Sequence, residues 1–190
     1  LQVPGEEAFT GRGVSYCATC DGAFFRDKVT AVVGGGDVAV EDAVFLSRIC
    51  KKVYLIHRRD SLRAAKSLQD TLFQCDNVEV IWDSVVEEIC GQEKTSSIKL
   101  RRLKEERTEE LPVDGVFIAV GIRPNTELLQ NIVTFDENGY IKAGEDCVTC
   151  TPGIFAAGDV RTKQLRQIVT AVADGANAVA SAEKYFIEIK

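Results

Sequence analysis

The stretch Val32-Val33-Gly34-Gly35-Gly36-Asp37-Val38-Ala39 joins a β-branched run to the start of a helical pattern. Residues 28–33 are typical of a buried parallel strand that enters a tight turn, and the apolar spacing over residues 38–49 predicts a helix. The segment between them fits GxGxxA, a pattern that binds a dinucleotide when a strand precedes it and a helix follows. In that pattern Gly34 permits the turn, Gly36 lets the pyrophosphate approach the helix N-terminus, and Ala39 allows close packing. We therefore expect the cofactor to be bound by Gly34, Gly35, Gly36, Asp37, Val38 and Ala39.

The alternation of strands and helices continues after this turn. Strands are predicted over residues 53–56 and 78–82, and a helix capped by Ser61 is predicted over residues 61–73. This β-α-β-α-β order implies a doubly wound parallel sheet. Three short antiparallel strands should follow, at residues 85–90, at residues 98–103 and near Leu111, with the charged run 104–110 as a solvated hairpin tip. Residues 115–120 return as a buried strand.

The composition changes after Asn125. We expect a buried strand over residues 153–160 and a long helix over residues 168–186, whose small side chains suit close packing against a sheet or a cofactor. The predicted fold class is α/β. A Rossmann-like domain with an antiparallel meander should occupy residues 1–123, beginning with a connector, and part of a second α/β domain should occupy residues 124–190.

The amino-acid composition and net charge indicate which kinds of partner and compartment the protein has. The 190 residues are 45% hydrophobic and 27% charged, as in an ordinary globular protein. The net charge of −6 argues against nucleic acid as a partner, and no apolar run approaches the ~18 residues of a membrane span. The seven cysteines are odd in number and form no secreted disulfide framework, so the cytoplasm or another reducing compartment is favoured.

A pair of cysteines precedes the glycine turn, in Cys17-Ala18-Thr19-Cys20-Asp21-Gly22. A CxxC pair beside a βαβ pattern is typical of a redox dithiol, and Asp21 is the nearest group able to exchange a proton with it. Two other interpretations remain: a purely structural pair, or half of a zinc site. Tetrahedral zinc needs four ligands, and the other half would have to come from Cys147 and Cys150 in the second predicted domain. We therefore expect no metal.

Basic residues follow the second strand of the predicted sheet. An NAD site usually has an acidic residue at this position, which holds the ribose hydroxyls. This chain has His57-Arg58-Arg59, with Arg63 one helical turn further. Clustered guanidinium groups suit a 2′-phosphate, so NADPH is the favoured cofactor. The alternative is a basic surface corner, and His57 alone would more often be structural.

Together these residues resemble the low-molecular-weight thioredoxin reductase family. The shared motifs occur in the family's order and approximate spacing over essentially the whole chain. They are residues 17–22, the glycine turn with Ala39-Val40-Glu41, His57-Arg58-Arg59-Asp60, Gly121 to Asn125, Gly158-Asp159 and Arg166-Gln167.

The resemblance implies a homodimeric flavoenzyme with an NADPH domain and an FAD domain that swing relative to each other. In that family NADPH reduces FAD, FAD reduces the Cys17–Cys20 disulfide, and the dithiol reduces thioredoxin. Cys20 would face the flavin, Cys17 would exchange with the protein substrate, and Asp21 would donate the proton. The remaining cofactor contacts implied by the resemblance are Gly121, Gly158, Asp159, Arg166, Gln167 and Ile168.

The chain also departs from the family pattern. The family's FAD domain begins with its own GxGxxG upstream of the connector, and the only qualifying cluster here is Gly34 to Gly36. We therefore expect a fragment that lacks the N-terminal half of the FAD domain and cannot hold FAD tightly. Val38 and Cys150 replace residues that carry hydroxyl groups in the family.

Two other functions are compatible with these motifs. The first is an NADH-dependent flavoprotein disulfide reductase that serves a peroxidase, although that group lacks the arginine pair. The second is a non-catalytic nucleotide-binding module whose dithiol senses redox state, and a zinc-binding module is a more distant third.

Overall fold

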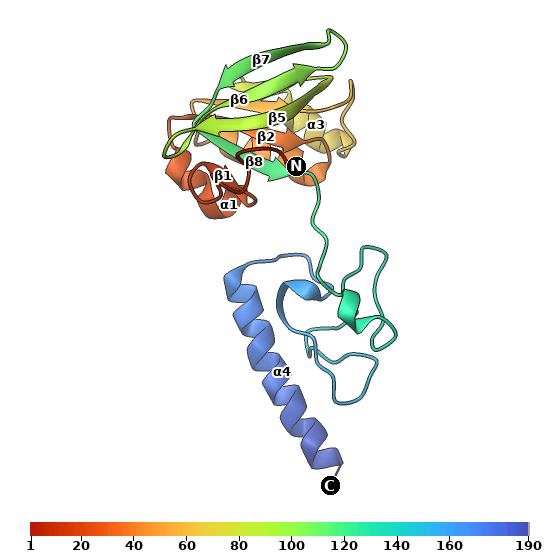
Figure 1. The fold of residues 1–190 in the computed structure, drawn as a ribbon. Coiled ribbons are helices and arrows are strands. Elements are labelled where there is room, and N and C mark those ends of the chain that lie inside the picture. The colour runs from red at the N-terminus through yellow and green to blue at the C-terminus, as the bar shows by residue number, and fades with distance from the viewer. Residues whose placement is uncertain (190) are drawn as a thin grey trace. The chain divides into compact units, whose positions relative to one another are not determined.

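The computed structural model describes residues 1–189. The chain divides into two compact units, Leu1–Gly121 and the segment from Ile122 onward (Figure 1). Each unit has its own hydrophobic cluster or clusters. Among the described residues, no helix is both long and apolar enough to span a bilayer.

A five-stranded parallel sheet forms the centre of the first unit. Its strand order, β1-β8-β2-β3-β4, contains only parallel pairs. Connections between parallel neighbours must cross over the sheet, which accounts for the helices in between. The α/β fold class predicted from the sequence is therefore confirmed. The strands are β1 (Val14–Ser15), β2 (Val29–Gly34), β3 (Lys52–Ile56), β4 (Val78–Ile81) and β8 (Gly115–Ala119).

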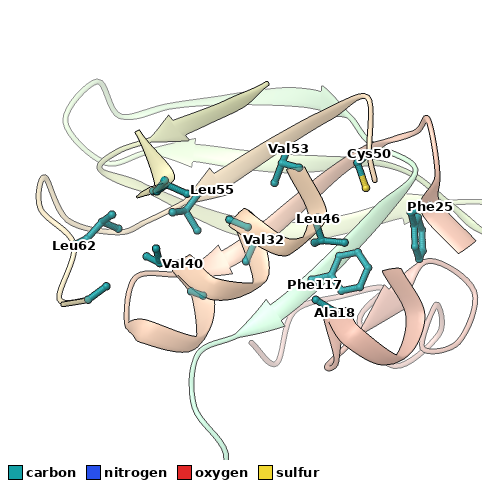
Figure 2. Close-up of a cluster of buried hydrophobic side chains, with 14 residues drawn as sticks. Ala18, Phe25, Val32, Val40, Leu46, Cys50, Val53, Leu55, Leu62 and Phe117 are labelled. Atoms are coloured by element: carbon teal, nitrogen blue, oxygen red, sulfur yellow. The ribbon is translucent and has the colours of Figure 1, made fainter. Parts of the chain in front are cut away.

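Helices cover one face of this sheet. Helix α2 (Asp37–Ser47) and helix α3 (Lys66–Leu72) follow strands β2 and β3. Figure 2 shows Val40 and Leu46 of α2 directed at Val32 of β2 and Phe117 of β8. All four side chains are almost completely buried, and burial of each such side chain contributes roughly 1.5–3 kcal/mol.

An antiparallel sheet covers the opposite face. It consists of β5 (Ser84–Gly91), β6 (Thr95–Arg102) and β7 (Arg107–Pro112) (Figure 1). Ala31 and Val33 of β2 pack in one cluster with Ile98 and Leu100 of β6. The charged run 104–110 is only partly the predicted hairpin tip, because most of it forms β7, where Glu109 pairs with Arg102 of the neighbouring strand β6.

The dithiol segment packs beside α2. Helix α1 (Ala18–Asp21) is a single turn and continues into the 3₁₀ turn η1 (Gly22–Phe25). A Cβ atom on Gly22 would lie 3.0 Å from the Phe45 ring and 3.1 Å from Leu46. The ring of Phe25 meets that of Phe117 edge-on, with 5.2 Å between centroids. These contacts fix the short helix to the edge of the sheet.

The second unit contains one long helix, α4 (Ile168–Glu188), and the 3₁₀ turns η2 (Glu127–Leu129) and η3 (Gly158–Val160). The strand predicted over residues 153–160 is not formed. Phe155 makes only an isolated bridge to Val148. The backbone also turns at Gly153 and Gly158, which both have φ of +81°. An apolar run forms a strand only where another strand lies beside it, and none does within the described part of this unit.

Candidate active site

A cleft of about 370 Å³ opens at the carboxyl ends of the parallel strands. In open α/β sheets this edge is where ligands bind. The glycine turn after β2, the basic segment after β3 and the start of β5 form its walls. Its lining includes Gly34, Gly35, His57, Arg58, Arg63, Ser84 and Ala119.

Two of the three glycines in the turn are required by close packing. A Cβ atom on Gly34 would lie 2.4 Å from the carbonyl oxygen of Ala119 and 2.6 Å from Cβ of Ala39. A Cβ atom on Gly35 would lie 2.3 Å from the His57 ring. A Cβ atom on Gly36 would meet nothing within 4 Å. Gly36 therefore leaves open space directly before α2, where an anionic group can approach backbone N–H groups.

The segment after β3 is fastened to the glycine turn. Arg63 N–H donates to the carbonyl of Gly35 at 2.7 Å. Ala65 N–H donates to Oδ1 of Asp37 at 2.8 Å. These bonds hold residues 63–65 outside the helix, so α3 begins at Lys66 rather than at the predicted Ser61. They also fix the backbone of Arg63 at the cleft.

His57 is buried in the wall of the cleft, with 5% of its surface exposed. Burial lowers the pKa of its imidazole, and the nearby charges of Arg63, Arg59 and Arg58 lower it further. The ring meets that of Trp82 edge-on, with 6.5 Å between centroids. Its Nε2 atom has no hydrogen-bond partner. This nitrogen is buried, so it is a polar atom of the cleft wall without a partner.

Arg58, Arg59 and Arg63 are all exposed. Among residues 1–189, no carboxylate lies within ion-pair distance of any of them. The adjacent Asp60 instead lies 3.9 Å from Nζ of Lys104. The three guanidinium groups thus leave a local excess of positive charge that suits a phosphate.

The two cysteines of the CxxC motif form a disulfide, with 5.3 Å between their Cα atoms. Cys17 is the N-cap of α1, and its sulfur accepts a hydrogen bond from Cys20 N–H at 3.2 Å. Cys147 and Cys150, in the other unit, are free thiols. No cluster of three potential metal ligands occurs among the described residues. The two sulfur atoms of the CxxC motif are therefore bonded to each other.

Asp21 lies one turn after Cys17. Its Oδ2 atom accepts a hydrogen bond of 2.6 Å from the hydroxyl of Ser15. The same hydroxyl accepts from Cys17 N–H at 3.1 Å. The predicted proton donor is therefore connected to the backbone of the dithiol through one serine.

The cofactor residues predicted in the second unit lie around the start of α4. Arg166 donates from Nε to the carbonyl of Asp159 at 3.3 Å and stacks 3.8 Å above the Tyr140 ring. Gln167 forms a capping box with Thr170. Ile168 is 86% exposed. The structure therefore brings Asp159 and Arg166 together. Gly121, by contrast, is the last residue of the first unit and has a φ of +115°.

Residues 1–175 match the family described as pyridine nucleotide-disulphide oxidoreductase. The chain belongs to this family. Thioredoxin reductase of Listeria innocua is 51% identical over 191 residues, which cover 100% of this chain and 60% of that protein. Thioredoxin reductase of Streptomyces coelicolor is 46% identical over 97% of this chain and 58% of its own length.

Solved structures of related proteins agree with this assignment. The crystal structure of thioredoxin reductase from Streptococcus pyogenes matches with a TM-score of 0.95 and 51% identity, over 99% of this chain and 62% of that chain. Thioredoxin reductase from Giardia duodenalis matches with a TM-score of 0.88 and 37% identity. The chain therefore spans about 60% of the length of the relatives that it matches.

One buried polar group in the second unit was not predicted from the sequence. The Asp174 carboxylate, which is 3% exposed, accepts hydrogen bonds from Arg161, Lys163 and the N–H of Gly158. Arg161, together with Lys163, holds the pKa of this carboxyl well below its usual range. The available signal was an acidic residue within the Ala- and Val-rich first half of the helix, because a buried charge requires partners.

Proposed function

We propose that this chain is part of an NADPH-dependent thioredoxin-disulfide reductase. Reducing equivalents would pass from NADPH through FAD to the Cys17–Cys20 disulfide, and from the dithiol to thioredoxin or a thioredoxin-like protein. One observation carries the proposal: the CxxC disulfide and a cleft lined by His57, Arg58 and Arg63 occur in the same compact unit. The similarity to thioredoxin reductases at up to 51% identity supports it.

The first unit would bind NADPH. The open space beside Gly36 would receive the pyrophosphate at the N-terminus of α2. The unpaired guanidinium groups of Arg58, Arg59 and Arg63 would contact the 2′-phosphate, since planar donors suit phosphate oxygens. His57, whose pKa is lowered by burial, would remain neutral in the wall of the cleft.

The dithiol would carry out the exchange chemistry. When the disulfide opens, Cys20 N–H would stabilise negative charge on the sulfur of Cys17, because it already donates to that atom. Cys17 would then attack the disulfide of the acceptor protein, and Cys20 would be the sulfur that faces the flavin. Asp21 would exchange the proton with the dithiol.

The second unit would be the C-terminal portion of an FAD domain, and the domains would meet near residue 123. When bound, the flavin supplies two-electron transfer between nicotinamide and disulfide. Gly158, Asp159, Arg166, Gln167 and Ile168 would line its site, with Gly121 near the domain junction. Helix α4 leaves large apolar side chains exposed, which supports its being covered in a longer protein. They are Ile168, Val169, Val172, Val179, Phe186 and Ile187.

The same proposal extends to assembly and location. We propose a homodimer in a cytoplasmic or otherwise reducing compartment, with neither nucleic acid nor membrane as a partner. The net charge of −6 supports the exclusion of nucleic acid.

Calorimetric titration with NADPH and NADH tests the nucleotide assignment. Arg58→Ala/Arg59→Ala should weaken NADPH binding at least about tenfold and spare NADH, since hydrogen bonds to charged groups contribute about 1.5–3 kcal/mol. Arg26→Ala/Arg48→Ala removes two exposed arginines outside the cleft as a charge-matched control. Equal losses for both nucleotides would contradict the assignment. Binding of NADH alone would favour the peroxidase-linked reductase, and binding of neither would favour the non-catalytic module.

A further inference from the structure

The hydroxyl of Ser15 connects the two groups that disulfide exchange requires. We propose that Ser15 is a positioning residue, which holds the Asp21 carboxylate where it exchanges a proton with the Cys17–Cys20 pair. The inference rests on the proposed function and adds a residue to its chemistry.

Ser15 is itself held firmly. It ends strand β1, pairs with Phe117 of the parallel strand β8, and is 5% exposed. Its hydroxyl therefore extends from the sheet rather than from a mobile loop. A group fixed in this way can determine the orientation of a neighbour that lies on a single helical turn.

The hydroxyl of Ser15 has one proton and makes three contacts. It lies 2.6 Å from Oδ2 of Asp21 and 3.3 Å from the carbonyl of Cys17. The shorter, charge-assisted contact takes the proton, because a bond to a carboxylate is the stronger one. A lone pair of the oxygen accepts Cys17 N–H at 3.1 Å. One oxygen atom thus contacts both the backbone of the dithiol and the carboxylate.

The single turn of α1 closes this arrangement into a ring. Asp21 N–H donates to the carbonyl of Cys17 at 3.1 Å, while the side chain of Asp21 returns to Ser15. Without the hydroxyl, the carboxylate would lose this donor and could rotate about its side-chain bonds. Misplacing a proton-transfer group removes much of its contribution to rate.

The reaction of the oxidised chain with dithiothreitol isolates this step. A thiolate of the reagent attacks one sulfur of the Cys17–Cys20 bond, and the other sulfur leaves with the bonding electrons. The second thiol of the reagent then attacks the mixed disulfide, which releases the cyclic disulfide of dithiothreitol. Two electrons pass to the protein, and the two protons of the reagent end on the cysteines. The Asp21 carboxylate, held by Ser15, accepts the proton that the attacking thiol of the reagent releases and delivers it to the leaving thiolate.

The test is a double-mutant cycle on the rate of this reduction between pH 5 and pH 8, followed by alkylation of Cys17 and Cys20 and mass spectrometry. Ser15→Ala should slow reduction about tenfold, as part of the 10²–10⁴-fold contribution of a positioned acid–base group. In an Asp21→Asn background it should slow reduction no further. Ser15→Ala and Asp21→Asn should also alter the pH profile in the same way.

Ser97→Ala is the matched control. Ser97 is also buried on a strand, and its hydroxyl donates to Oε1 of Glu110 at 2.5 Å, far along the chain from the dithiol. Reduction by dithiothreitol should be unchanged in this variant. The same variant shows how much of any effect comes from deleting a buried hydroxyl as such.

Ser15→Thr and Ser15→Val provide a second comparison that suits a strand position. They differ by one hydroxyl, so the threonine variant should keep the wild-type rate and the valine variant should lose it. Equal slowing by Ser15→Ala in both backgrounds, or equal rates for the Thr and Val variants, would overturn the role of Ser15. A wild-type disulfide that does not react with dithiothreitol would instead overturn the proposed disulfide chemistry.

Discussion

Substitution of Asp174 should unfold the second unit and leave the first unit intact. Its carboxylate accepts bonds of 2.7 and 2.8 Å from Arg161, 2.6 Å from Lys163 and 2.8 Å from Gly158 N–H. Arg161 is 4% exposed, so solvent does not replace the lost partner. Asp174→Ala therefore leaves two buried cations and one backbone N–H without their acceptor.

The expected magnitude follows from this geometry. Breaking a buried ion pair by removing one partner costs about 3–5 kcal/mol. Since about 1.4 kcal/mol corresponds to a factor of ten in an equilibrium constant, the ratio of folded to unfolded second unit should fall at least about a hundredfold. The hydrophobic cluster of this unit has four buried members, Val133, Ile141, Ala143 and Ala156, so it offers little to offset the loss.

Hydrogen exchange followed by mass spectrometry measures this effect unit by unit. Amides of α4 should lose protection in Asp174→Ala, while amides of β2 and β3 should keep theirs. Lys163→Ala retains the Arg161 pair and should have a smaller effect. Asp159→Ala removes an exposed carboxylate from the same unit and serves as the control. Wild-type protection of α4 in Asp174→Ala would refute the reasoning.

The ion pairs of Asp174 with Arg161 and Lys163 determine how the stability of the second unit changes at low pH. Arg161 and Lys163 hold the pKa of the Asp174 carboxyl well below its ordinary value of 3.8. A depressed folded pKa gives stability that is fully present above the unfolded value and lost as pH falls through the folded one. The hydrogen-exchange protection of α4 amides that depends on these ion pairs should therefore persist down to about pH 4 and decline only below it.

Two further predictions concern the first unit. Gly36→Ala should leave the free energy of unfolding nearly unchanged but weaken NADPH binding, whereas Gly35→Ala should lower the free energy of unfolding by about 1–3 kcal/mol because its Cβ meets the His57 ring. Urea titration measures the stability of both variants, and calorimetry measures their NADPH binding. Equal stability of the two variants would contradict the packing argument. Burial, followed by the charge of Glu41, raises the pKa of Asp42 to about 6. The wild type should therefore lose stability as pH rises from about 4 to 6, so Asp42→Asn should be the more stable protein at pH 7.5 and equal to the wild type near pH 4. Urea titration measures the stability of both proteins at pH 4 and pH 7.5. The same difference in stability between wild type and Asp42→Asn at both pH values would show that the titration of Asp42 does not cause it.

Features that depend on local sequence were predicted well. The β-branched run before Gly34 and the apolar spacing after Val38 correspond to β2 and α2 within two residues. The glycines of the turn and the two cysteines of the CxxC motif lie close together in the sequence. Their spacing alone therefore predicts the turn and the disulfide. The cofactor roles assigned to these residues remain predictions.

Features that depend on distant partners were not predictable in the same way. The apolar run 153–160 has the composition of a strand, yet its backbone conformation depends on neighbours that the described chain does not place beside it. Helix α3 starts late because Gly35 and Asp37, far earlier in the sequence, bond to residues 63 and 65. Ser15 and Asp174 were missed for the same reason, since neither stands out until the partners of its side chain are known.

The edge-on contact between His57 and Trp82 gives this protein a built-in optical probe. Trp82 is the one tryptophan in the chain, and its ring centroid lies 6.5 Å from that of the imidazole lining the cleft. Indole emission therefore originates wholly in the first unit and next to the cleft at the carboxyl ends of the parallel strands. Fluorescence titration can follow occupancy of that cleft without any attached dye.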